Sequence, residues 1–245
     1  MKTVAIIQAR ASSTRLPGKV MMALGGKPML QNIVERIGRA ETIDEVVVAT
    51  SVMKSDDVVA ELLKKEGIPC FRGSLDNVLE RFFLCAKQHE ADIVIRFTGD
   101  NALVSPELID EAVKVFQDSD IDYLYYKKSL PLGMCIEVFS FSALRKAYEE
   151  AKDSECLEHV TPYIRKNPEM FRVVNYENKS DEDHSGLRFT LDTPQDYEFV
   201  SRIYDFFGSN TFSFADVLKA LEIHPDWIAI NRSIVQKTTK YKGEA

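Results

Sequence analysis

The segment from Arg10 to Lys19 concentrates side chains that can bind an anion. It reads R-A-S-S-T-R-L-P-G-K, with three cationic residues, three hydroxyls in a row and a Pro-Gly pair. From Lys2 to Val34 there are five Lys or Arg and no Asp or Glu, although the whole chain has a formal charge of -7. Guanidinium forks, an ammonium and backbone N–H groups are the donors that suit a polyphosphate. We therefore expect this segment to bind a small, strongly anionic ligand.

Two observations about this segment keep an alternative open. The G-x-x-x-x-G-K-[ST] spacing of a P-loop is absent, so the segment is not that phosphate-binding motif. A run of charges is also commonly just a solvated loop, and composition alone does not decide between the two interpretations.

The elements around this segment predict where it lies. Short β-branched runs alternate with amphipathic segments in the first half, which predicts βαβ units and a parallel sheet. We expect strands at 3–8, 45–50, 68–71 and 92–97, and helices at about 29–39, 56–66, 76–88 and 106–116. Ligands of such sheets bind at the carboxyl ends of the strands, where the basic segment leaves the first strand.

The second half of the chain predicts an insertion into this sheet. Strands are expected at 123–127, 135–139, 171–176 and 187–191, with helices at 142–151, 158–165, 194–206, 213–221 and 225–234. We predict the α/β class, with a Rossmann-like, mostly parallel sheet flanked by helices. Residues 1–245 form a single domain in this interpretation, with a β/α insertion at about 121–186.

The composition excludes several classes of protein. The chain has 245 residues, 45% hydrophobic and 28% charged, as in soluble globular proteins, and no apolar run approaches the ~20 residues that span a bilayer. Four cysteines without a C-x-x-C pair suit free thiols in a reducing compartment. Net acidity argues against binding to nucleic acid. We expect a cytoplasmic protein without nucleic-acid or membrane partners.

The opening segment, followed by G-G-K-P-M-L, resembles the start of the cytidylyltransferases that activate sugar acids. These include the CMP-KDO synthetases, the CMP-acylneuraminate synthetases and the SpsF-like branch of spore coat polysaccharide biosynthesis. Further segments match in order: F-R-G-S-L-D-N-V-L-E-R-F (71–82), R-F-T-G-D-N (96–101), P-L-G-M-C-I-E-V-F-S (131–140), E-H-V-T-P-Y-I (158–164) and L-R-F-T-L-D-T-P-Q-D-Y (187–197). The resemblance spans nearly the whole chain, is greatest to the SpsF-like branch, and implies a fold of the nucleotide-diphospho-sugar transferase type.

The resemblance implies an activity and a set of site residues. CMP would be transferred from CTP to an acidic, nonulosonate- or KDO-like sugar with release of pyrophosphate, and Mg²⁺ would be held by Asp100 and Asp192. Catalysis would involve Arg10, Arg15, Lys19 and Asp100. The nucleotide would be bound by Gln8, Ala9, Arg10, Ser13, Thr14, Arg15, Lys19, Arg72, Ser74 and Asp76.

The acceptor would bind to the insertion, through which relatives form homodimers. The polar candidates there and nearby are Tyr125, Lys127, Glu137, His159, Arg165 and Arg188. The chain departs from the usual G-D-x-P-L-x-D-P pattern of the branch, because Ala102 and Ser105 replace its Pro and second Asp. Any role of that second Asp is absent here, which leaves open a different acceptor or a different metal shell from those of relatives.

The aspartates also have structural interpretations. Asp100 follows Gly99 as a turn residue would, and Asp192 precedes Thr193-Pro194 as at the start of a helix. Asp196 is expected to be an acid of the first helical turn rather than a ligand.

Three other functions remain alternatives at this point. The first is a nucleotide-sugar-dependent glycosyltransferase, for which Asp118-Ser119-Asp120 formally supplies a D-x-D metal motif. The second is a cytidylyltransferase acting on an aminoalkylphosphonate. The third is a non-catalytic nucleotide-binding protein, which would not need Lys19, Asp100 and Asp192 together.

Overall fold

A seven-stranded, mostly parallel sheet forms the centre of the molecule, with strand order β5-β4-β1-β6-β8-β7-β9. The computed structural model describes residues 1–13, 15–177 and 182–236. The strands are β1 (Thr3–Gln8), β4 (Glu45–Ser51), β5 (Cys70–Gly73), β6 (Ile93–Thr98), β7 (Tyr123–Lys128), β8 (Ile136–Ser140) and β9 (Val173–Glu177), and a separate hairpin pairs β2 (Ala23–Leu24) with β3 (Lys27–Pro28).

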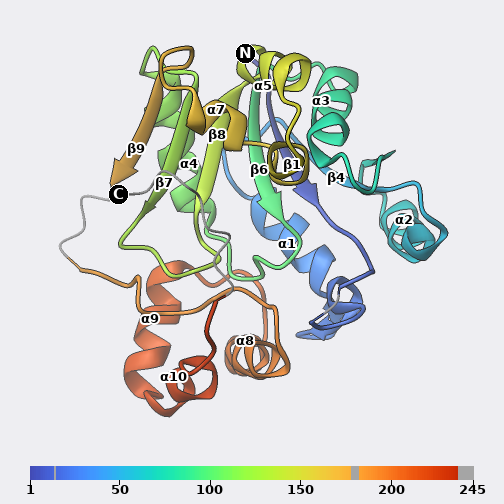
Figure 1. Cartoon of the computed structure of the whole chain (residues 1–245). Coiled ribbons are helices and arrows are strands. Elements are labelled where there is room, and N and C mark those ends of the chain that lie inside the picture. The colour runs from blue at the N-terminus through green and yellow to red at the C-terminus, as the bar shows by residue number, and fades with distance from the viewer. Residues whose placement is uncertain (14, 178–181, 237–245) are drawn as a thin grey trace.

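Helices cover both faces of the sheet and the space beneath it (Figure 1). The first half contributes η1 (Lys19–Met21), α1 (Met29–Ile37), η2 (Lys54–Asp56), α2 (Asp57–Lys65), α3 (Val78–Gln88) and α4 (Pro106–Gln117). The second half contributes α5 (Phe141–Glu150), α6 (Ser154–His159), α7 (Pro162–Lys166), α8 (Pro194–Phe207), α9 (Phe214–Ile223) and α10 (Asp226–Asn231).

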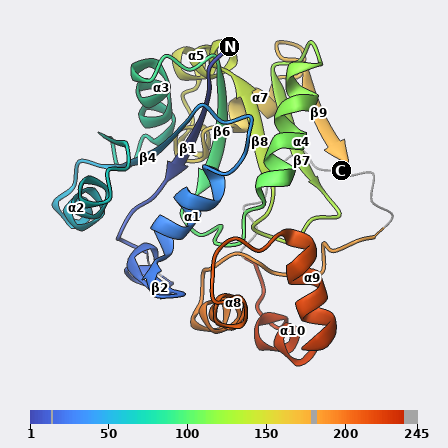
Figure 2. The ribbon, with the colours of Figure 1, turned by 180° about the vertical axis from the view of Figure 1, so that it is seen from behind.

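The central strands are apolar on both faces because helices pack on both. In β1 the side chains alternate between two hydrophobic cores, with Ile7 on one face and Ile6 on the other. Helices α3 and α5 cover the face with Ile6, and α1 and α4 cover the opposite face, as the views from front and back show (Figures 1 and 2). A strand buried on both sides reads as a continuous apolar run, which is why β1 was identifiable from sequence.

The strands of the insertion extend the same sheet. β8 is antiparallel to β6 and to β7, so β7 runs in the same direction as β6, and β9 is parallel to β7. The predicted fold class is confirmed: a mostly parallel sheet with helices on both sides, into which one antiparallel strand is inserted.

Two predicted elements are wrong. Residues 187–191 are not a strand, because the N–H of Phe189 bonds to Leu132 and the N–H of Leu191 bonds to Asp100, two separate partners rather than one neighbouring strand. The predicted helix at 158–165 is divided into α6 and α7. Val160, with φ 71°, breaks the helical backbone between the two, and Pro162 begins α7, since proline is favoured at the first position of a helix.

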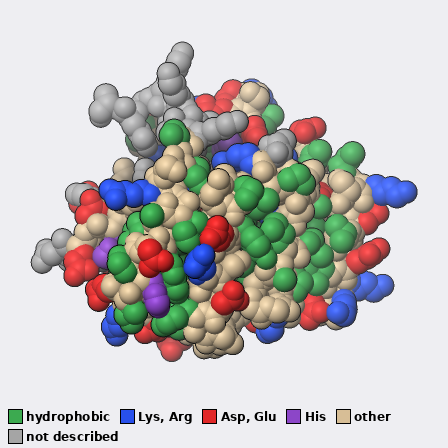
Figure 3. All heavy atoms as spheres, turned by 90° about the horizontal axis from the view of Figure 1, so that it is seen from below, with side chains coloured by type: hydrophobic (Ala, Val, Ile, Leu, Met, Phe, Trp, Pro, Cys, Tyr) green, Lys and Arg blue, Asp and Glu red, His purple; other side chains and the backbone are tan. Residues whose placement is uncertain are grey.

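Helices α8, α9 and α10 lie below the carboxyl edge of the sheet (Figure 1). Seen from below, the surface shows hydrophobic side chains gathered near the middle, and basic side chains stand singly among acidic ones rather than in a stripe (Figure 3). Within the described ranges, no helix combines the length and the apolar character needed to cross a membrane.

Candidate active site

Lys19 lies at the centre of the candidate site, where it joins two aspartates from distant parts of the chain. Its Nζ donates to Asp100 Oδ2 at 2.8 Å, to Asp192 Oδ1 at 2.8 Å and to the backbone oxygen of Leu191 at 2.9 Å. A guanidinium nitrogen of Arg15 lies 2.8 Å from Asp192 Oδ2. Because Asp100 and Asp192 both contact the Lys19 nitrogen at 2.8 Å, the two contacting carboxylate oxygens are separated by at most about twice this distance. The structure thus brings together four predicted residues.

The carboxyl edge of the sheet explains how these residues meet. Asp100 comes just after β6, where the hydroxyl of Thr98 donates to its Oδ1. The N–H of Leu191 donates to the backbone oxygen of Asp100 at 3.0 Å, which places Asp192 beside it. Thr98 and the oxygen of Leu191 were not predicted as site groups. For Thr98, the only signal in the sequence was a weak one, a polar residue just before Gly99-Asp100. A backbone oxygen such as that of Leu191 leaves no signal in the sequence.

Asp196 holds the segment that carries Asp192. It is fully buried at the start of α8 and accepts hydrogen bonds from the N–H groups of Asp192 and Thr193, both at 3.0 Å. With Thr193 it forms a capping box, so its predicted position in the first helical turn is confirmed. Nε and NH2 of Arg188 donate to its two oxygens at 2.7 and 2.9 Å. The guanidinium of Arg188 is thereby occupied and buried, which does not favour its predicted contact with an acceptor.

The surroundings favour ionised carboxylates. Burial raises the pKa of Asp100, but the charge and hydrogen bond of the Lys19 ammonium, with the Thr98 hydroxyl, lower it more, so this pKa lies below its ordinary value. Burial also raises the pKa of Asp196, and hydrogen bonds from Arg188 and from the N–H of Asp192 more than offset this. Both side chains are therefore anionic at neutral pH.

Asp100 and Asp192 have the donor chemistry of a Mg²⁺ site. Mg²⁺ is commonly bound by one or two carboxylates and completes its shell with phosphate and water oxygens. No group of three or more His, Cys, Asp or Glu suited to a metal ion occurs in the part of the chain that the structure describes. The oxygens of Asp100 and Asp192 that a cation would take contact the Lys19 ammonium. Because two carboxylates supply only part of the shell of Mg²⁺, these residues fit a cation that brings further ligands, such as phosphate oxygens.

The loop that leaves β1 carries the other residues predicted for phosphate binding. Arg10 is exposed, and the hydroxyl of Ser13 accepts the N–H of Leu16 at 3.3 Å. Thr14 lies outside the described residues. Gln8 ends β1 at the same edge, and Nε of Arg96 donates to its side-chain oxygen at 3.3 Å.

Ala9, the next residue after β1, is buried, and its N–H donates to the backbone oxygen of Ala49 at 3.2 Å. This bond ties the beginning of the loop to β4.

The second predicted nucleotide loop lies between β5 and α3. Ser74 accepts the N–H of Asn77 through its hydroxyl at 3.0 Å, and Asp76 is exposed. The guanidinium of Arg72 points instead toward the start of α2, where it contacts the backbone oxygens of Ser51 and Met53 and the carboxylate of Asp57. The structure therefore brings Arg72 to a structural contact rather than to the group around Lys19.

Glu137 is buried in the insertion and occupied on both carboxylate oxygens. Oε1 accepts the hydroxyls of Tyr123 and Thr161, each at 2.6 Å, and Oε2 pairs with Arg96. These contacts tie β6, β7, β8 and the start of α7 together. Glu137 is therefore placed to orient the surrounding elements, and direct contact with an acceptor stays a prediction.

The other acceptor candidates lie on the same face of the sheet. The guanidinium of Arg165 lies 4.8 Å from the ring centroid of Tyr125, which is paired in register with Glu137. His159 ends α6 and is half-buried. The side chain of Lys127 lies outside the described part of the structure.

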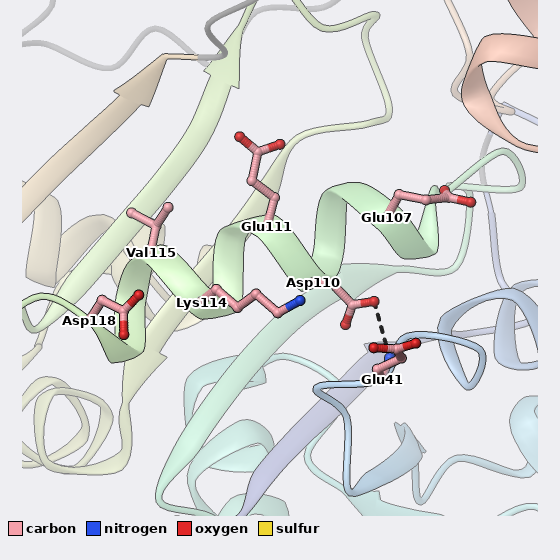
Figure 4. A pocket seen from close by; sticks show the side chains of 7 residues that line it. All are labelled: Glu41, Glu107, Asp110, Glu111, Lys114, Val115 and Asp118. Carbon is pink, nitrogen blue, oxygen red and sulfur yellow. Dashed lines mark hydrogen bonds between the residues drawn. The ribbon is translucent and has the colours of Figure 1, made fainter.

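A pocket on α4 is separate from this group. It is lined by Glu41, Glu107, Asp110, Glu111, Lys114, Val115 and Asp118 (Figure 4). Asp110 caps the N–H of Glu41 at 3.1 Å, and Glu111 accepts the hydroxyl of Tyr126 at 3.0 Å. Asp110 and Glu111 thus already serve the fold, and of the lining residues only Asp118 was considered in the sequence, as part of the D-x-D alternative.

Comparison with known sequences identifies the family of this chain. The profile of the family described as "Cytidylyltransferase" matches residues 4–224. The chain belongs to the cytidylyltransferase family. It is 36% identical over 227 residues to the spore coat polysaccharide biosynthesis protein SpsF of Bacillus subtilis, covering 90% of this chain and 94% of the relative. A 3-deoxy-manno-octulosonate cytidylyltransferase of Geobacter metallireducens is 38% identical, over 46% of this chain and 44% of the relative.

Solved structures share the architecture of this cytidylyltransferase family member. A cytidylyltransferase from Leptospira borgpetersenii aligns with a TM-score of 0.89 and 34% identity, covering 96% of this chain and 100% of that one. A CMP:2-keto-3-deoxy-manno-octonic acid synthetase solved with CTP aligns with a TM-score of 0.66 and 18% identity, over 84% of this chain and 99% of that one. The second likeness is one of fold.

Proposed function

We propose that this chain transfers CMP from CTP to a small acidic acceptor and releases pyrophosphate. The observation that carries the proposal is the contact of Lys19 with both Asp100 and Asp192 beside an acid-free loop, in a member of the cytidylyltransferase family. A loop that served only solubility would not need a buried ammonium joined to two carboxylates from remote segments.

The reaction forms a bond between an acceptor oxygen and the α-phosphorus of CTP and breaks the bond from that phosphorus to the β-phosphate. Negative charge builds on the phosphate oxygens, and positioned cations stabilise it. Arg10 and Arg15 bind the triphosphate from the loop, and Lys19 reaches its oxygens from the floor of the site. Mg²⁺, held by Asp100 and Asp192, would supply further stabilisation of this charge when bound.

The acceptor binds over the face that carries Tyr125, His159 and Arg165 in this proposal. A guanidinium suits a carboxylate, as in a nonulosonate- or KDO-like sugar, and equally suits the phosphonate of an aminoalkylphosphonate. The similarity to SpsF favours the sugar and a role in surface polysaccharide biosynthesis. We further propose a cytoplasmic homodimer without nucleic-acid or membrane partners.

One observation disfavours a glycosyltransferase with a D-x-D motif. The triplet Asp118-Ser119-Asp120 precedes β7. The first residues of β7 and β6, Tyr123 and Ile93, pair with neighbouring residues of β8, Phe139 and Ser140, so both strands start at the same edge of the sheet. The triplet therefore lies at the amino edge of the sheet, opposite the edge that carries Lys19 and Asp100. A metal held there would be remote from the loop.

Pyrophosphate release tests the proposal. Purified protein is incubated with CTP, Mg²⁺ and one acceptor from a panel of sugar acids, aminoalkylphosphonates and sugar phosphates. Release that depends on one acceptor class identifies that class. Release of UDP or another nucleoside diphosphate from a nucleotide-sugar would instead support the glycosyltransferase alternative.

Calorimetry with CTP, UTP, ATP and GTP tests the nucleotide. Cytosine presents an amino donor where uracil has an oxygen, and a site built for that donor leaves buried groups unpaired when uracil enters. Backbone oxygens near Gln8 and Ala9 and the loop at 72–76 are the proposed contacts of the base. We expect strong preference for CTP; equal affinity for UTP would contradict this part of the proposal.

A further inference from the structure

Ala11 is the point at which the basic loop is closed and attached to the rest of the protein. Its backbone oxygen accepts the N–H groups of Ser13 and Gly18, both at 3.0 Å, so the two ends of the turn meet on one atom. Its own N–H donates to Oδ1 of Asp56 at 2.7 Å, 45 residues away in sequence. Gly18 has φ 70° and directly precedes Lys19. The position of Lys19 thus depends on a chain of bonds that ends at Asp56.

Asp56 is held rigidly by a different βα unit. Its side chain is fully buried at the end of η2, and its second oxygen accepts the hydroxyl of Ser51 at the end of β4. Ser51 in turn accepts the N–H of Met53 at 3.1 Å. A carboxylate fixed in this way offers Ala11 an acceptor that does not have to be ordered when a ligand arrives.

The negative charge of Asp56 also has a local reason. Arg81 is buried on α3, and its NH1 donates to the backbone oxygen of Ser74 in the second predicted nucleotide loop at 2.5 Å. The pKa of Arg81 is lowered to about 10, chiefly by burial and also by the charge of Arg10, while the charge of Asp56 opposes this lowering. The charge of Asp56 therefore favours the ionised form of Arg81, whose guanidinium holds the backbone of the second loop at Ser74.

We propose that Asp56 is a positioning residue for the basic loop, holding Ala11 so that Gly18 and Lys19 are set before the nucleotide binds. The proposal rests on the proposed function, in which this loop binds the triphosphate. Asp56 touches no substrate in this role; it acts through the backbone of Ala11.

Limited proteolysis measures the loop without using activity. The side chains of Arg10 and Arg15 are exposed, but trypsin needs an extended, locally unfolded backbone at the bond that it cleaves, so cleavage after them reports opening of the loop. We expect cleavage at these sites to be at least about tenfold faster in Asp56→Ala than in the unaltered protein. Asp56→Asn keeps an oxygen for Ala11 and should cleave at nearly the unaltered rate. Asp57→Asn, an exposed neighbour paired with Arg72, is the matched control and should also be unchanged.

Two results would overturn the positioning role. One is cleavage of Asp56→Ala at the unaltered rate, and the other is fast cleavage of Asp56→Asn, which would make charge rather than the hydrogen bond decisive. Hydrogen exchange in the unaltered protein needs no variant. The Ala11 amide should be protected about 10²-fold or more, and unprotected exchange would equally contradict the proposal.

CTP binding separates this proposal from the function on which it rests. Asp56→Ala should bind CTP about tenfold more weakly, with kcat at saturation changed by less than about threefold, because ordering the loop is paid for on binding. If the loop opens in Asp56→Ala but CTP affinity is unchanged, Asp56 positions the loop and the loop does not bind CTP. That outcome removes the phosphate-binding assignment and leaves the positioning role.

Discussion

Lys19 combines two roles that are usually assigned to separate residues. A lysine in a basic loop is expected to be solvated, yet Lys19 is only 9% exposed, with its ammonium between two carboxylates. It is the internal counterion of Asp100 and Asp192 and, in the proposed function, also contacts the phosphates of CTP. Removal of its charge should therefore affect folding as well as catalysis.

We predict that Lys19→Met lowers stability and activity together. The free energy of unfolding should fall by about 2–4 kcal/mol, because the half-buried carboxylate of Asp100 and the buried carboxylate of Asp192 lose their partner. Turnover should fall on the order of 10²-fold or more, the scale for losing one electrostatic stabiliser. Urea unfolding and pyrophosphate release measure the two effects. Lys27→Met, which removes an exposed pair with Glu35, is the control and should change neither by much.

Glu137 gives a prediction about pH. Burial raises its pKa, but Arg96, Thr161 and Tyr123 lower it more, so the pKa lies below its ordinary value. A depressed carboxyl pKa contributes stability that is present above the unfolded pKa of about 4.3 and is lost as pH falls through the folded value. Glu137→Gln should cost roughly 2–4 kcal/mol at pH 7 and progressively less at pH values below about 4. Denaturant unfolding at several pH values measures this, and a cost independent of pH would contradict the ionised pair.

The segment at 187–192 is the element on which the site depends most. It runs beside Gly133, whose φ is 98° and at which a Cβ atom would lie 2.6 Å from the backbone nitrogen of Thr190. The atoms nearest to this Cβ position belong to the backbone of Phe189 and Thr190, so neither segment of the chain has much room to move. The close approach places Asp192 at the edge of the sheet without a strand to support it.

We predict that Gly133→Ala disturbs the site through this segment. The variant should lose about 2–4 kcal/mol of stability from backbone strain and overpacking, and its kcat should fall because Asp192 is displaced. Gly186→Ala is the control, since nothing lies within 4 Å of its Cβ position and its φ is outside the left-handed region. Equal effects of the two substitutions on melting temperature and kcat would show that the close approach is unimportant.

The elements that could be predicted from sequence are those whose pattern is local. β1 and α1 follow from an apolar run and a 3.6-residue period, and the loop between them follows from its charges. Glu137 was assigned to the acceptor as a polar residue of the insertion, an assignment that stays a prediction, and strand alternation does not reveal its pairing with Arg96 on the next strand. The bond from Asp56 to Ala11 also depends on tertiary geometry, because no spacing rule relates residues 45 positions apart.

At the scale of the whole molecule, the acidic chain places its acid-free loop beside two aspartates, the half-buried Asp100 and the buried Asp192. Those aspartates are neutralised by Lys19 and Arg15 rather than by the remaining surface. A triphosphate alone would face their negative charge, and a divalent cation alone would face the ammonium. The two ligands should therefore stabilise the fold best when they are present together.

Thermal unfolding tests this dependence. CTP with Mg²⁺ at about 100 times the dissociation constant should add about 2.7 kcal/mol, a shift of roughly 5–10 °C for a protein of this size, and either ligand alone should give less than half of it. Lys19→Met should respond weakly to the pair. Equal shifts with CTP in the presence of Mg²⁺ or of EDTA would contradict the cooperation between the ligands.

The direction of β1 has a practical consequence for attaching this protein to a surface. The chain enters β1 at the amino edge of the sheet, where the N–H of Lys2 bonds to Asp92, and the amino terminus lies at the opposite end of the molecule from α8 and α10 (Figure 1). A tag or linker fused ahead of Met1 would point away from the loop. Toward the other end of the chain, the side-chain oxygen of Gln236 accepts a hydrogen bond from Arg188 at 2.5 Å, behind Asp192. Immobilisation for binding measurements should therefore use the amino-terminal end.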